Sequence, residues 1–109
     1  MLLREKKCVP CEGGTQPLTA GEVRALLPHI SSAWSVEDDN VLVREYAFKD
    51  FKEALMFVNK VGAIAEKEDH HPDILLYGYN RVRIRLSTHA IGGLSENDFI
   101  LATKIDADD

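Results

Sequence analysis

The clearest pattern of hydrophobic and polar positions lies at residues 81–87. Apolar Val82, Ile84 and Leu86 alternate there with three arginines. A period of two places the two kinds of side chain on opposite faces of a β-strand, so one face is expected to be buried. The apolar run 74–77 precedes this strand, and a glycine-containing turn lies between them. Together the two runs predict a β-hairpin.

A second hairpin is predicted further upstream. Strand-like runs occupy 34–36 and 41–48, and the polar residues 37–40 between them have turn composition. The only tryptophan, Trp34, begins the first run. So large an apolar side chain is expected either in the core or in the wall of a binding site.

The longest predicted helix begins after Asp50, which is suited to cap it together with Glu53. A 3.6-residue period of apolar positions indicates one face packed on the sheet. That predicted face comprises Phe51, Ala54, Leu55, Val58, Val61, Gly62 and Ala65. A second apolar set points away from it and comprises Met56, Phe57, Ala63 and Ile64. Since an exposed apolar surface favours association, we expect self-association through this helix.

Two shorter helices are predicted near the ends of the chain. Thr19 with Glu22, and Ser95 with Asp98, have the spacing of helix N-terminal capping pairs. The order is then helix, hairpin, helix, hairpin, helix. This order favours an α+β fold, with a four-stranded antiparallel sheet and three helices packed on one face.

Composition and charge narrow the class of protein. The chain has 109 residues, 45% of them hydrophobic and 28% charged, as in an ordinary globular domain. We expect a single domain over 1–109, with an irregular arm at 1–17, a core at 18–106 and a frayed acidic tail at 107–109. The net charge of −5 argues against nonspecific nucleic-acid binding. Neither a membrane-spanning run nor a secretory signal is evident, so a cytoplasmic location is expected.

Both cysteines, Cys8 and Cys11, lie in one Cys-x-x-Cys motif within the arm. A closed zinc site needs about two further ligands. A redox pair of this type usually stands at a helix start after a strand, whereas Pro10 and the following glycines favour a loop. We interpret the pair as reduced, noncatalytic thiols.

The candidate chemistry is concentrated around His70 and His71, which follow an acidic run and precede Pro72. Proline cannot continue a helix and forces the preceding residue toward an extended conformation. The two histidines should therefore stand at a helix-to-strand junction, where loops commonly present reactive groups. His89 comes just past the arginine-rich strand. Imidazoles can accept or donate protons near neutral pH, so these histidines predict an acid/base site.

Other interpretations of these residues are open. Glu66 can be a solvated charge at a helix end, and Asp98 can be a helix cap alone. Three histidines also suffice for a catalytic zinc centre. However, adjacent ligands are awkward for one ion, and the usual helical ligand spacings are absent. We therefore expect no metal at this site.

The spacing of these residues resembles the signature of the pterin-4a-carbinolamine dehydratases. The resemblance covers roughly residues 18–106. It is carried by the motifs EKEDHHP (66–72), LSTH (86–89) and GLSEND (93–98), with FKDF (48–51) and Tyr79. The resemblance implies an α+β fold, dimers or tetramers, and dehydration of 4a-hydroxytetrahydropterin without metal or organic cofactor.

The resemblance also implies roles for individual residues. His70, His71 and His89 would be catalytic or would orient the substrate, with the acid and the base left open. The residues that would shape the pterin pocket are Asp69, Ser87, Thr88, Ala90 and Trp34. Glu66 and Asp98 would be carboxylates that orient imidazoles. Two rival functions are a noncatalytic dimerisation or coactivator module and a metal-dependent hydrolase.

Overall fold

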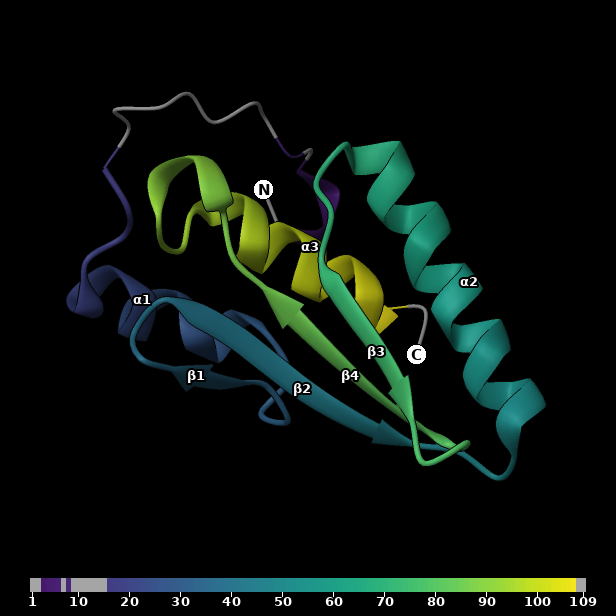
Figure 1. The fold of residues 1–109 in the computed structure, drawn as a ribbon. Coiled ribbons are helices and arrows are strands. Elements are labelled where there is room, and N and C mark those ends of the chain that lie inside the picture. Colours follow the sequence, from purple (N-terminus) through teal and green to yellow (C-terminus); the bar gives the residue numbers. More distant parts are fainter. Residues whose placement is uncertain (1–2, 7, 9–15, 108–109) are drawn as a thin grey trace.

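The computed structural model describes residues 3–6, 8 and 16–107 and shows an antiparallel sheet with helices on one side (Figure 1). The strands are β1 (Ser35–Glu37), β2 (Val41–Ala47), β3 (Asp73–Tyr77) and β4 (Arg81–Leu86), in the order β1-β2-β4-β3. The helices are α1 (Ala20–Leu26), α2 (Phe51–Glu68) and α3 (Glu96–Ala107). Short 3-10 turns occupy Leu3–Glu5, Leu27–His29 and His89–Ile91. The predicted α+β class, with four antiparallel strands and three helices, is confirmed.

Both predicted hairpins are present. The turn residues Asp38 and Asp39 have φ of 52° and 60°, and Gly78 and Tyr79 have φ of 56° and 57°. Two successive residues at positive φ match the twist of antiparallel strands, which is why tight hairpins favour this geometry. The register pairs Ser35 with Val43 in the first hairpin.

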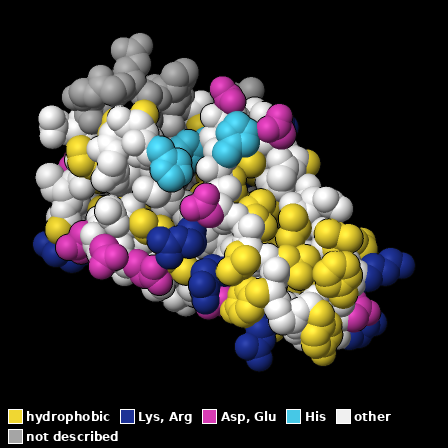
Figure 2. All heavy atoms as spheres, in the orientation of Figure 1, with side chains coloured by type: hydrophobic (Ala, Val, Ile, Leu, Met, Phe, Trp, Pro, Cys, Tyr) yellow, Lys and Arg dark blue, Asp and Glu magenta, His cyan; other side chains and the backbone are white. Residues whose placement is uncertain are grey.

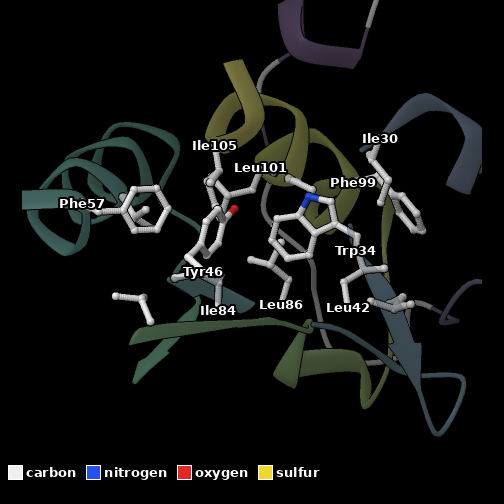
Figure 3. Close-up of a cluster of buried hydrophobic side chains, with 14 of the residues drawn as sticks. Ile30, Trp34, Leu42, Tyr46, Phe57, Ile84, Leu86, Phe99, Leu101 and Ile105 are labelled. Carbon is white, nitrogen blue, oxygen red and sulfur yellow. The ribbon is translucent and has the colours of Figure 1, made fainter. Parts of the chain in front are cut away.

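The core lies between the sheet and the helices (Figure 3). On β4, Val82, Ile84 and Leu86 are completely buried, as their alternation predicted. Burying side chains of this size contributes about 1.5–3 kcal/mol each. The arginines of β4 lie on the open face of the sheet, where Arg83 pairs with Glu45 of the adjacent β2 and Arg85 reaches Glu37 of β1.

The inward face of α2 differs from the prediction. Ala54, Val61 and Ala65 are buried as expected, but Phe51 and Leu55 are 51% and 43% exposed. Phe57, predicted to point away, is buried because it packs on Tyr46, with 4.4 Å between the centroids of the two rings. Apolar residues surround much of this helix, so periodicity alone could not select the buried side. The predicted outward set is therefore wrong for Phe57 and for Ile64, which packs partly against the core, whereas Met56 and Ala63 are exposed.

Helix α3 is buried along nearly its whole length, from Asn97 to Thr103 and again at Ile105. The sheet covers one side, and the Leu3–Glu5 turn packs near the other (Figure 1). The arm predicted to be irregular thus contains an ordered turn, and Leu3 and Cys8 pack against the core. Cys11 lies outside the described residues, so the interpretation of the Cys-x-x-Cys motif stays a prediction.

Candidate active site

The site begins where α2 ends. Asp69 adopts the left-handed conformation, with φ of 52°, and its amide donates to the carbonyl of Glu66. The amide of His70 then donates to the carbonyl of Ala65 at 3.2 Å. These two bonds form a Schellman motif, which stops a helix and turns the chain back. Glycine is usual at the left-handed position, and aspartate is among the few other residues that tolerate it.

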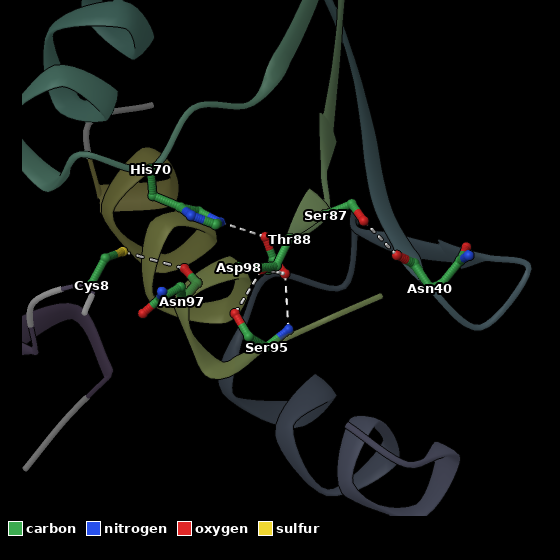
Figure 4. A network of polar contacts seen from close by, with 8 residues as sticks. All are labelled: Cys8, Asn40, His70, Ser87, Thr88, Ser95, Asn97 and Asp98. Atoms are coloured by element: carbon green, nitrogen blue, oxygen red, sulfur yellow. Dashed lines mark hydrogen bonds and ion pairs between the residues drawn. The ribbon is translucent and has the colours of Figure 1, made fainter. Parts of the chain in front are cut away.

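This turn directs the imidazole of His70 toward α3 (Figure 4). Its Nε2 atom lies 2.7 Å from Oδ1 of Asp98. The His70 side chain is 12% exposed and that of Asp98 is fully buried. A contact between a buried carboxylate and an imidazole fixes the ring orientation and is stronger than the same contact in water.

The second oxygen of Asp98 has its own partners. Oδ2 accepts from the Thr88 hydroxyl at 2.9 Å and from the amide of Ser95 at 3.0 Å. The hydroxyls of Thr88 and Ser95 are in turn 2.7 Å apart. The amide contact is one half of the predicted capping box. Asp98 therefore caps α3 through one oxygen and contacts His70 through the other, so it does more than cap the helix.

His71 points to a different carboxylate. Its Nε2 atom lies 2.8 Å from Oε1 of Glu66, and both side chains are exposed. An exposed ion pair contributes little to stability. The contact acts on His71 itself, because Glu66 can fix which ring nitrogen of His71 carries a proton.

His89 begins the 3-10 turn after β4, and both it and Ala90 are exposed. The preceding Thr88 is buried and bonded to Asp98, so His89 is joined to the His70–Asp98 pair through its neighbour. Ser87 instead donates its hydroxyl to the carbonyl of Asn40. Figure 2 shows histidine side chains gathered on one face, near the start of β3 and the end of β4. The fold thus brings together segments predicted to share one site.

Trp34 is placed elsewhere. It is 5% exposed and lies in the core with Leu42 and Phe99 (Figure 3). Its indole N–H donates to Oδ1 of Asp106 at 2.8 Å. Of the two interpretations of Trp34, this position favours core packing.

The sequence does not single out two residues that lie beside the site, Ser95 and Glu68. The sequence predicts only a cap for Ser95, whereas its hydroxyl also contacts that of Thr88. Glu68 belongs to the acidic run before the histidines, yet its side chain is buried. The usable signal for Glu68 was its place at the helix end, one turn after the buried Ala65.

Among residues 3–6, 8 and 16–107, no group of three or more His, Cys, Asp or Glu side chains is arranged to hold a metal ion. Within the same residues, no helix is long and apolar enough to cross a membrane.

Comparison with known proteins shows which family the chain resembles. The family model for pterin 4 alpha carbinolamine dehydratase matches residues 16–107. A protein of Alkaliphilus metalliredigens assigned to the pterin-4-alpha-carbinolamine dehydratases is 50% identical over 104 residues, covering 95% of this chain and 93% of its own. One of Halorhodospira halophila, assigned likewise, is 48% identical over 108 residues, covering 98% and 97%.

Solved structures give the same result. The transcriptional coactivator/pterin dehydratase of Brucella melitensis matches with a TM-score of 0.76 and 35% identity, covering 84% of this chain and 97% of its own. A pterin dehydratase-like protein described as a RuBisCO assembly factor of the alpha-carboxysome matches with a TM-score of 0.57 and 23% identity, covering 69% and 87%, and shares the fold. The chain belongs to the pterin-4a-carbinolamine dehydratases, a family of hydro-lyases.

Proposed function

We propose that this protein dehydrates 4a-hydroxytetrahydropterin to quinonoid dihydropterin and water, and so serves pterin recycling, with its histidines transferring the protons. The observation that carries the proposal is the 2.7 Å contact between His70 Nε2 and the buried carboxylate of Asp98. In the elimination, the carbon–oxygen bond of the hydroxyl breaks and its electron pair leaves with the oxygen. A proton joins that oxygen to form water, and another leaves a ring nitrogen, so no oxidant or reductant is consumed.

His70 is the better candidate for the base. A carboxylate only accepts hydrogen bonds, so Nε2 of His70 is the donor in the contact with Asp98. The other ring nitrogen, Nδ1, is then able to accept a proton from the substrate. A base of this kind contributes about 10² to 10⁴ in rate.

His71 and His89 are the candidates for the acid. Both are exposed, and they flank His70 from the α2–β3 junction and from the turn after β4. Glu66 lies 2.8 Å from Nε2 of His71 and can orient that imidazole toward a departing hydroxyl. Asp69, Ser87 and Ala90 border these histidines in sequence and are proposed to contact the pterin.

The test is whether the protein accelerates decay of 4a-hydroxytetrahydropterin, formed in the assay by an aromatic amino acid hydroxylase, above its spontaneous rate. His70→Ala and His89→Ala should each lower the enzymatic rate by at least about tenfold. His29→Ala is the matched control, because His29 is exposed in the turn after α1. Unchanged rates in both site variants would refute the assigned roles, and no acceleration by the wild type would favour a noncatalytic module.

We also propose that copies of the chain associate through α2. Phe51, Leu55 and Met56 are exposed apolar residues of that helix, and Leu75 is exposed on the neighbouring strand β3. Figure 2 shows hydrophobic side chains gathered over α2 and the β3–β4 hairpin. Because β3 is an edge strand, a second copy could cover both the strand and the helix about a two-fold axis.

A further inference from the structure

Glu68 is a buried carboxylate to which the proposed mechanism gives no task. It is the last residue of α2, and its side chain is only 3% exposed. Burying an ionised carboxylate is costly unless polar partners surround it. A carboxylate buried at a helix end is therefore expected to have polar partners.

The partners of Glu68 come from two other segments of the chain. Its Oε1 atom accepts a hydrogen bond from the backbone amide of Cys8 at 3.0 Å. Its Oε2 atom lies 3.6 Å from Nζ of Lys104 on α3. One side chain thus joins the end of α2, the N-terminal arm and α3.

These contacts lie next to the His70–Asp98 pair on both sides. Glu68 precedes His70 by a single intervening residue, the strained Asp69. On the other side, the Cys8 thiol donates to the carbonyl of Asn97, the neighbour of Asp98, at 3.5 Å (Figure 4). Cys8 therefore contacts both the end of α2 and the start of α3.

We propose that Glu68 is a positioning residue, which holds the end of α2 against the arm and α3 so that His70 meets Asp98. Helix ends fray, and the left-handed Asp69 adds local strain that must be offset by surrounding contacts. Groups that transfer protons lose efficiency when displaced by about 1 Å. The N-terminal arm is then a functional part of the protein, because it supplies the amide that Glu68 binds.

The experiment compares Glu68→Ala and Glu68→Gln with the wild type in the full chain. The first readout is the downfield imidazole N–H proton resonance of the His70–Asp98 hydrogen bond, identified by its loss in His70→Ala. The second is the division of the kinetic effect between kcat and KM, which rests on the proposed function. Asp106→Asn is the control, because it weakens the contacts of Asp106 with Trp34 and Arg44 near the C-terminal end of α3.

We expect Glu68→Ala to lose the resonance and to lower kcat about tenfold while KM changes by less than about threefold. Glu68→Gln keeps an oxygen for the Cys8 amide and should retain the resonance and more of kcat. Asp106→Asn should lower stability yet keep both. An intact resonance and unchanged kcat in Glu68→Ala would overturn the proposal, and so would equal losses in Asp106→Asn.

A second pair of variants tests the contact between Glu68 and the Cys8 amide from the side of the arm. This pair tests the proposal even if Glu68→Ala does not fold. Cys8→Pro removes the amide N–H that Glu68 binds, and Cys8→Ala keeps it. Loss of the resonance in the proline variant alone supports the proposal, whereas identical behaviour of the two variants overturns it. If the wild type shows the resonance but no dehydration, the proposed function fails while the resonance still tests the positioning.

Discussion

His70 and Asp98 are separated by 28 positions in the chain, yet Nε2 of one lies 2.7 Å from Oδ1 of the other. The contact joins the end of α2 to the first turn of α3. Because Oδ2 is occupied by Thr88 and Ser95, only Oδ1 faces the imidazole. The two oxygens of Asp98 therefore have different partners and different tasks.

Asp98→Asn should lower the dehydration rate by about a hundredfold or more. The free energy of unfolding should change less than the activation free energy of dehydration. The Thr88 hydroxyl and the Ser95 amide both need an acceptor, so the amide oxygen should take the place of Oδ2. The NH₂ group would then face Nε2 of His70 and force the proton onto Nδ1, which could no longer act as a base. Nitrogen NMR of the imidazole reports the tautomer; an unchanged tautomer with normal activity would contradict this assignment.

Glu66→Gln should have a much smaller effect than Asp98→Asn. The His71–Glu66 pair is exposed, so its loss should change the free energy of unfolding by less than about 1 kcal/mol. The dehydration rate should fall by less than about tenfold. Chemical denaturation and the same kinetic assay check both values, and a loss matching that of Asp98→Asn would give Glu66 a larger role than proposed.

Trp34→Phe should destabilise the protein by about 2 kcal/mol, because Asp106 loses the indole N–H donor while the ring volume is largely kept. If Trp34 serves only the core, KM for the pterin should not change. The measurements are thermal unfolding and steady-state kinetics. A raised KM at normal stability would instead place Trp34 in the substrate pocket.

Glu45 and Tyr77 form a pH-dependent pair on the open face of the sheet, where the Tyr77 hydroxyl donates to Glu45 at 2.6 Å. The hydrogen bond raises the pKa of Tyr77, and together with Arg83 it lowers the pKa of Glu45. The Tyr77 contribution to stability is present below the unfolded pKa of about 10 and is lost as pH rises through the folded pKa.

The Glu45 contribution has the opposite sign, since it is present above the unfolded pKa of about 4.3 and is lost as pH falls through the folded pKa. Glu45→Gln should move the pKa of Tyr77 back toward its usual value, as followed by NMR titration of the ring. A Tyr77 titration that is identical in the variant would show that the contact is not maintained in solution.

Leu55→Glu should weaken self-association, because it places a charge among the exposed apolar residues of α2. The wild type should sediment as a dimer or tetramer at micromolar concentration, and the variant should shift toward monomer. Arg24→Glu, an exposed position of α1 outside this surface, should leave the assembly intact. A wild type that stays monomeric at high micromolar concentration would exclude association through this surface.

The sequence by itself determined the strands, their hairpin turns and the helix starts. These features depend on local patterns, such as the alternation of Val82, Ile84 and Leu86 or the capping pair Thr19 and Glu22, which forms both of its hydrogen bonds. The spacing of the histidines and Asp98 also indicated the family. In each case the information lies within a few residues or in a fixed motif.

Only the tertiary structure decided which side of α2 is buried and how the carboxylates are used. Phe57 is buried because Tyr46, on a different element, packs against its ring. Whether Asp98 does more than cap α3 stayed open in the sequence, and the place of Glu68 at a helix end did not reveal that its carboxylate is buried. Their burial follows from the way α2, α3 and the N-terminal arm meet, and it is this contact between distant segments that places His70 against one carboxylate and Cys8 against the other.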